Sequence, residues 1–216
     1  MLNVGLTGGI ASGKSTVDLM FQEKGAYLID HDALAHRVED LDRPAWKDIV
    51  EFFGTEVLNE DRTINRARLG ALVFGDEAKL KKLNDIVHPA VFREWMNEIE
   101  EITRKEPRAI IISDIPLLFE VGWQDTVDII VLIYISRDEQ IRRLTARNGY
   151  SASEAEERLS AQMPIDDKVF RADFVVNNEG SLDETRANVA KVWEDLVERE
   201  RVKSLKGRFF KLKDRP

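Results

Sequence analysis

Five short segments of the chain are dense in β-branched and aromatic residues without polar alternation, the pattern of strands buried on both faces. These segments are residues 2–7, 26–30, 109–114, 127–135 and 172–177. Helical spacing of apolar residues fills the intervals. One helical segment covers residues 14–24 and should end at Gly25. Another covers residues 182–197, after a capping box formed by Ser181 and Glu184. This alternation predicts an α/β fold with a mostly parallel sheet covered by helices on both faces.

Two long segments interrupt the alternation. Residues 33–106 contain helical patterns and no convincing strand, which predicts a separate helical lobe. Residues 137–171 are charged and rich in arginine, and we expect a mobile lid there, with a helix capped by Ser153 and Glu156. The core then comprises residues 1–32, 107–136 and 172–200, followed by a basic tail, residues 201–216, with Phe209 and Phe210. We expect the tail to form a docked or frayed helix, with weak contact to an acidic partner as the alternative.

Composition narrows the functional classes. The chain has 216 residues, 43% of them hydrophobic, and a formal net charge of −8. This apolar content excludes disorder, and the acidic charge disfavours nucleic acid and anionic membranes as partners. The absence of cysteine excludes disulfides and thiolate metal sites. The longest apolar run, residues 127–135, is too short to cross a bilayer, and the first residues lack the features of a signal peptide. We expect a cytoplasmic protein that is monomeric or weakly homo-oligomeric.

The stretch "GLTGGIASGKST", residues 5–16, follows the first predicted strand. Gly8, Gly13, Lys14 and Ser15 match the phosphate-binding pattern G-x-x-x-x-G-K-[ST]. Glycines let consecutive backbone N–H groups turn around an anion, and the helix that starts near Lys14 points its positive end there. Lys14 can reach the β- and γ-phosphates, and the Ser15 hydroxyl can bind Mg²⁺. We therefore expect a nucleoside triphosphate site in this loop, called here the P-loop (residues 8–16).

A P-loop does not by itself identify a reaction. No asparagine is followed by lysine, so the guanine-reading N-K-x-D motif of common GTPases is absent. The third predicted strand ends in Asp114 alone, with Pro116 two residues later, whereas a motor ATPase would end this strand in consecutive acids. A kinase of a small metabolite needs an acceptor pocket and a lid with arginines, which fits the two interrupting segments.

Several motifs together resemble those of the dephospho-coenzyme A kinase family: "GLTGGIASGKST", "IDHD", "IVHP", "PLLFE", "QIRRLTARNG" and "ADFVVNNEG", in the family's order and spacing. The resemblance runs from Val4 to about Trp193. It implies a P-loop nucleotide-kinase fold with a five-stranded core, a helical substrate lobe and a lid. It also implies transfer of the ATP γ-phosphoryl group to the ribose 3′-hydroxyl of dephospho-coenzyme A, the last step of coenzyme A synthesis.

The motif and the resemblance together assign the site residues. The expected catalytic residues are Lys14, Asp32 and Arg143. The residues expected to bind ATP are Gly8, Gly9, Ile10, Ala11, Ser12, Gly13, Lys14, Ser15, Thr16, Arg143, Arg147 and Asn178. The residues expected to bind dephospho-coenzyme A are Thr7, Asp32, His88, Leu117, Leu118, Phe119 and Glu120. Mg²⁺ is expected on Ser15, with phosphate oxygens and waters.

Structural alternatives stay open for several of these residues. By resemblance Asp32 orients or deprotonates the acceptor hydroxyl, but it can also cap the following helix. His88 contacts the acceptor or caps a helix that begins at Pro89. Thr7 contacts substrate or is a satisfied core threonine. Residues 117–119 form an acceptor wall or pack in the core, and the two lid arginines, four residues apart on one helix face, bind the triphosphate or remain solvated.

The chain departs from the family pattern at two positions. Ala11 replaces a usual glycine, and we expect it to adopt a negative φ because the position is a wildcard of the motif. His31 replaces alanine between Asp30 and Asp32. It should point away from both acids if strand-like alternation continues there. The competing functions are a kinase of another small acceptor, such as a nucleoside monophosphate, and a non-catalytic nucleotide switch.

Overall fold

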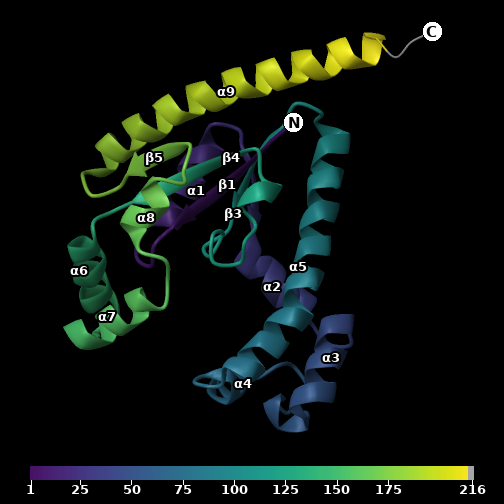
Figure 1. Cartoon of the computed structure of the whole chain (residues 1–216), viewed down its shortest axis with the longest axis vertical. Coiled ribbons are helices and arrows are strands. Elements are labelled where there is room, and N and C mark those ends of the chain that lie inside the picture. Colours follow the sequence, from purple (N-terminus) through teal and green to yellow (C-terminus); the bar gives the residue numbers. More distant parts are fainter. Residues whose placement is uncertain (214–216) are drawn as a thin grey trace. The chain divides into compact units, whose positions relative to one another are not determined.

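The structure, a computed structural model, describes residues 1–213, with side chains described through residue 205. Figure 1 shows the chain. Its strands are β1 (Leu2–Gly8), β2 (Tyr27–Asp30), β3 (Ile110–Asp114), β4 (Ile129–Tyr134) and β5 (Phe174–Asn177). Its α-helices are α1 (Lys14–Glu23), α2 (His31–Val38), α3 (Pro44–Phe53), α4 (Arg66–Val73), α5 (Glu77–Lys105), α6 (Arg137–Asn148), α7 (Ala152–Ser160), α8 (Ile165–Val169) and α9 (Leu182–Lys213). All five predicted strands are confirmed, each within two residues of its expected ends.

The five strands form one sheet in the order β2-β3-β1-β4-β5, with β1 parallel to β3 and β4, and β4 parallel to β5. Strand β1 is central, and the chain moves to one side of it for β2 and β3 and to the other side for β4 and β5. The direction of winding therefore reverses at β1, and ligands bind at the carboxyl ends of the strands at such a point. The P-loop directly follows β1 at that edge.

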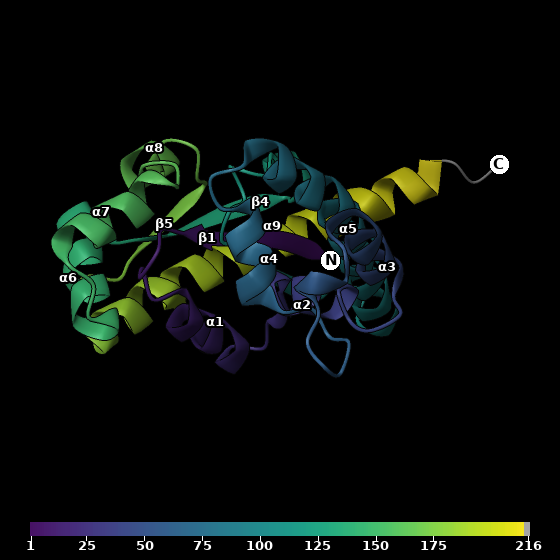
Figure 2. The same cartoon turned by 90° about the horizontal axis from the view of Figure 1, so that it is seen from below.

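Strand β1 alternates its side chains between the two faces of the sheet. Leu2, Val4 and Leu6 share one face and pack in a buried cluster with Ile112 of β3 and Val131 of β4. Helices α1 and α9 complete this cluster with buried apolar side chains. In Figure 2, α1 and α9 lie on one side of the strands and α8 on the other. The predicted α/β architecture with helices on both faces is confirmed, and burying β1 on both faces fixes the start of the P-loop.

Residues 30–101 form a compact unit of their own. Within it the chain forms helices and one isolated bridge between Leu58 and Ile64, as its pattern predicted. The predicted helix start at Pro89 is wrong, because α5 runs from Glu77 to Lys105 with Pro89 inside it. Proline removes only one backbone hydrogen bond, and apolar packing on both sides of it, at Val87 and at Trp95, outweighs that loss.

The capping box predicted at Ser153 is also wrong. Gly149 has φ 70° and ends α6, and α7 then begins at Ala152 with Ser151 as its cap. Ser151 Oγ accepts from the Glu154 N–H, and the Glu154 carboxylate accepts from the Ser151 N–H. The sequence "SASEAEE" offers the same motif at two overlapping positions. The Ser151 motif is the one that forms, because it places the apolar side chains of α7, Ala155 and Leu159, in a small core.

Helix α9 begins after the predicted Ser181–Glu184 box, which is present, since the Ser181 N–H donates to Glu184 Oε2 over 2.7 Å. It is longer than predicted and continues through the expected tail to Lys213. The side chains of Phe209 and Phe210 lie outside the described residues.

Candidate active site

The P-loop turns from β1 into α1, and two of its N–H groups bond within it, Ser12 to the Gly9 carbonyl and Thr16 to the Gly13 carbonyl, each over 3.1 Å. Gly13 caps α1 in a left-handed conformation, φ 84°, without a side-chain cap. Among the hydrogen bonds of the described residues, none uses the N–H groups of Ala11, Gly13, Lys14 or Ser15. Four such donors among residues 11–15, at the positive end of a helix, form an anion site.

Ala11 contradicts the expectation of a negative φ, because its φ is 61°. The loop must reverse direction within a few residues, and the left-handed conformation at this position accomplishes the turn. An L-residue there costs about 1 kcal/mol, which explains why the family uses glycine. Packing offsets the strain, since Ile10 and Ala11 lie against a small core that contains Leu144 of α6 and Leu159 of α7.

Lys14, the first residue of α1, pairs with the acid that ends β3. Its Nζ lies 3.1 Å from Asp114 Oδ1 and 3.3 Å from Oδ2, and both side chains are largely buried, with 15% and 13% exposed. The parallel register places Leu6 of β1 beside Asp114, so the two strand ends bring the pair together. The two residues lie 100 positions apart, so no sequence pattern connects them.

Two side-chain amides hold the P-loop from outside. Gln140 of α6 donates its Nε2 to the Ile10 carbonyl over 2.8 Å, and Asn178, which follows β5, donates its Nδ2 to the Ser12 carbonyl over 2.7 Å. A third amide, Gln162, accepts the Ile10 N–H on its Oε1 over 3.0 Å. Residues 137–171, the segment expected to form a lid and called here the lid segment, therefore bond to both the carbonyl and the N–H group of Ile10.

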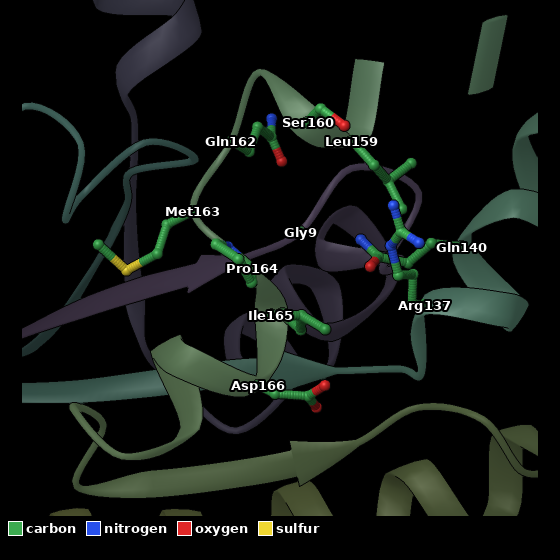
Figure 3. A pocket seen from close by; sticks show the side chains of 10 residues that line it. All are labelled: Gly9, Arg137, Gln140, Leu159, Ser160, Gln162, Met163, Pro164, Ile165 and Asp166. Carbon is green, nitrogen blue, oxygen red and sulfur yellow. The ribbon is translucent and has the colours of Figure 1, made fainter. Parts of the chain in front are cut away.

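A pocket of about 320 Å³ opens beside this contact, between Gly9 and the lid segment (Figure 3). Its lining comprises Gly9, Arg137, Gln140, Leu159, Ser160, Gln162, Met163, Pro164, Ile165 and Asp166. In Figure 3, Arg137 and Gln140 enter from one side and Met163 lies on the other. Arg137 forms an ion pair with Glu156. The pocket therefore borders the P-loop at Gly9, and its lining includes the Arg137 guanidinium and the side-chain amides of Gln140 and Gln162.

Arg143 is held against the P-loop, whereas Arg147 is not. Arg143 Nη2 donates to the Asn178 carbonyl over 2.7 Å, and Arg143 Nε donates to Glu139 over 2.6 Å. Hydrogen bonds from Arg142 and Arg143 lower the pKa of Glu139 to about 2, so this carboxylate stays charged. Arg147, one turn further along α6, is exposed and donates only to the neighbouring Asn148 among the described hydrogen bonds. Only Arg143 is preorganised beside the loop.

Most of the predicted acceptor residues on β1 and after β3 are buried or have polar partners within the protein. The buried Thr7 hydroxyl donates to the Pro116 carbonyl over 3.1 Å. Leu118 and Phe119 are buried, while Leu117 is 39% exposed. Glu120 Oε1 lies 2.8 Å from the fully buried Nζ of Lys168 and accepts the Met163 N–H over 3.0 Å. The Glu120 carboxylate therefore ties the loop after β3 to the end of the lid segment.

In the unit of residues 30–101, Asp30 caps α2, accepting the N–H groups of Asp32 and Ala33 over 2.8 and 3.0 Å. The alternative that Asp32 is the cap is wrong. Because α2 begins at His31, strand alternation stops there, and His31 is buried edge-on against Trp95. Asp32 is left exposed in a hollow of about 640 Å³, whose lining is Asp30, Asp32, Ala33, His36, Arg37 and Asp40. His88 is half-buried in α5, and burial lowers its pKa.

Comparison with known proteins identifies the family. A family model described as dephospho-CoA kinase matches residues 2–184. The chain belongs to the dephospho-CoA kinase family. A dephospho-CoA kinase of Syntrophus aciditrophicus is 56% identical over 94% of this chain and 86% of its own length. A dephospho-CoA kinase of Carboxydothermus hydrogenoformans is 44% identical over 89% of this chain and 95% of its own length.

Solved structures agree with this family assignment. TT1252 from Thermus thermophilus superposes with a TM-score of 0.79 at 36% identity, covering 90% of this chain and 96% of that one. The dephospho-CoA kinase from Campylobacter jejuni gives 0.70 at 26% identity, covering 91% and 97%. The fold is therefore that of a P-loop kinase, and the chain is a phosphotransferase.

Two further statements hold for the part of the chain that the structure describes. None of the helices has the length and apolar character needed to cross a membrane. Within the same residues, no group of three or more His, Cys, Asp or Glu side chains is arranged to hold a metal ion.

Three residues that shape the P-loop of this chain were not predicted from the sequence: Gln140, Gln162 and Thr185. The Thr185 hydroxyl donates to Asn178 Oδ1 over 2.8 Å. Isolated amides and hydroxyls have no characteristic spacing in sequence. The one available signal was helical, because Gln140 lies three residues before Arg143 and so shares its helix face.

Proposed function

We propose that this chain transfers the γ-phosphoryl group of ATP to the ribose 3′-hydroxyl of dephospho-coenzyme A, giving coenzyme A and ADP. The observation that carries the proposal is the set of four P-loop N–H donors beside the Lys14 ammonium, in a chain of this family. This arrangement suits a triphosphate, and the family relationship supplies the acceptor.

The P-loop, Lys14 and Arg143 provide the electrostatic part of catalysis. Phosphoryl transfer passes through a loose transition state, so charge neutralisation and positioning dominate the rate. The backbone donors bind the phosphate oxygens, and Lys14 exchanges its Asp114 partner for the β- and γ-phosphates. Arg143 starts from a fixed position beside Gly13 and neutralises charge on the leaving oxygens.

A divalent metal, which we assign as Mg²⁺, fits beside the first turn of α1. Ser15 is exposed there, and its hydroxyl is free of described hydrogen bonds. The Ser15 hydroxyl and phosphate oxygens would hold the ion. When bound, Mg²⁺ neutralises phosphate charge.

The helical residues 33–106 form the acceptor lobe in this proposal, and residues 137–171 form the lid. Asp32 orients the 3′-hydroxyl and accepts its proton, because it is an exposed carboxylate at the rim of an open hollow that also contains Arg37. Arg37, which forms an ion pair with Glu98, would exchange this partner for the phosphates of the acceptor. The need for ATP favours the cytoplasm as the place of reaction.

A coupled assay tests this function. Purified chain with Mg·ATP should release ADP rapidly with dephospho-coenzyme A and at background rates with AMP, CMP or pantetheine phosphate. Transfer to a nucleoside monophosphate at comparable kcat/KM would establish the competing kinase function. Slow hydrolysis that no acceptor stimulates would instead support a nucleotide switch. Product analysis by phosphorus NMR distinguishes the 3′- from the 2′-position.

A further inference from the structure

Two P-loop carbonyls are pinned by buried side-chain amides that come from distant parts of the chain. Gln140 donates to the Ile10 carbonyl over 2.8 Å, and Asn178 donates to the Ser12 carbonyl over 2.7 Å. The two amide residues are 3% and 7% exposed, so water does not compete for these bonds. Asn178 is itself held, since its Oδ1 accepts from the buried Thr185 hydroxyl.

The positions of the two amides explain two glycines of the P-loop, Gly9 at a wildcard position of the motif and Gly13 at its second glycine. A Cβ on Gly9 would lie 2.1 Å from Gln140 Nε2, and one on Gly13 would lie 2.4 Å from Asn178 Nδ2. Both distances are far below van der Waals contact. Any side chain at either position would therefore displace the amide that pins the adjacent part of the loop.

Pinning a carbonyl also fixes the N–H group of the next residue. A trans peptide is planar, so its C=O and the following N–H point in opposite directions. Holding the Ile10 carbonyl outward aims the Ala11 N–H inward, and holding the Ser12 carbonyl outward aims the Gly13 N–H inward. These are two of the four donors without partners among the described hydrogen bonds.

We propose that Gln140 and Asn178 are positioning residues that aim the Ala11 and Gly13 N–H groups at the bound triphosphate. This inference rests on the proposed function only in taking ATP as the ligand. Neither amide needs to touch the nucleotide. Gln140 lies on α6, the first helix of the lid segment, which directly follows β4. The lid segment therefore helps to set the geometry of the P-loop.

Calorimetric titration of Mg·ATP in the absence of acceptor tests the proposal. Gln140→Met keeps the shape and removes the donor, and should weaken ATP binding three- to tenfold, the range expected for one hydrogen bond. Asn178→Leu should weaken ATP binding by the same factor.

The matched controls are Gln22→Met and Asn188→Leu, which should bind ATP as wild type does. The KM for dephospho-coenzyme A should stay within twofold in every variant, which separates positioning from general loss of structure. Wild-type ATP affinity in both Gln140→Met and Asn178→Leu overturns the proposal.

A steric double-mutant cycle supplies a second, independent test that does not depend on Asn178→Leu folding. Gly9→Ala should weaken ATP binding at least tenfold in the wild-type background, because its Cβ collides with Gln140. In a Gln140→Ala background, Gly9→Ala should cost less than threefold. Equal losses in both backgrounds contradict the proposal. The titration contains no acceptor, so a chain that binds ATP but fails to phosphorylate dephospho-coenzyme A refutes the proposed function and leaves this test intact.

Discussion

Lys14 Nζ lies 3.1 Å from Asp114 Oδ1, so the cation of the P-loop is held by the carboxylate that ends the neighbouring strand. The pair sits at the carboxyl edge of the sheet, where β1 and β3 run parallel. A triphosphate carries more negative charge than one carboxylate and accepts several hydrogen bonds at once. Lys14 is therefore placed to move from Asp114 to the phosphates over a short distance.

Lys14→Ala should remove nearly all activity, because the P-loop loses its fixed cation while its backbone donors remain. Steady-state kinetics with Mg·ATP and dephospho-coenzyme A provides the measurement. The control is Lys24→Ala, an exposed lysine at the other end of α1. A Lys14→Ala enzyme that retained more than a tenth of wild-type kcat/KM would show that the ammonium group is dispensable.

Asp32→Asn should lower kcat far more than it changes ATP affinity, because an amide cannot accept the proton of the acceptor hydroxyl. The comparison requires kcat from the coupled assay and the Kd of Mg·ATP from calorimetry. Asp40→Asn, in the same hollow, serves as the control and should keep wild-type kcat. If Asp32→Asn also kept wild-type kcat, another residue would have to orient the acceptor.

Ala11→Gly should stabilise the chain by up to about 1 kcal/mol, because glycine adopts φ 61° without the steric cost that alanine carries. Urea unfolding monitored by tryptophan fluorescence measures this free energy of unfolding. Gly70→Ala, in α4, tests the reverse exchange where φ is helical, and should also stabilise. A loss of stability in Ala11→Gly would mean that contacts of the Ala11 methyl group outweigh the strain.

His31 should make the free energy of unfolding decrease as the pH is lowered. Burial lowers its pKa from 6.5 to about 4, against the opposing charge of Asp30. The unfolded chain therefore binds a proton first, and stability is full above pH 6.5 and lost as the pH falls toward 4. From pH 7 to pH 5 the loss should be about 2 kcal/mol.

Urea unfolding of His31→Leu at the same two pH values isolates this contribution. The leucine variant should lose much less stability between pH 7 and pH 5, while His36→Leu, an exposed position on the same helix, should behave as wild type does. Parallel pH dependence in His31→Leu and wild type would assign the effect to other groups, such as His88.

Local patterns succeeded wherever one interaction dominated. The five strands were predictable because buried parallel strands are continuous apolar runs, and Gly25 and the Ser181–Glu184 box correctly marked the end of α1 and the start of α9. Prediction failed where neighbouring residues offered equivalent choices. Ser151 and Ser153 carry the same capping motif, and only the packing of α7 selects Ser151.

The sequence by itself determined the family, the α/β core and the position of the phosphate-binding loop, because these depend on short-range patterns in apolar residues and glycines. Tertiary structure alone decided the partners of that loop: Asp114 for Lys14, Gln140 for Ile10 and Asn178 for Ser12. These partners lie 100 or more residues away along the chain, so no local spacing encodes them. They meet because parallel strands deliver their carboxyl ends to one edge of the sheet.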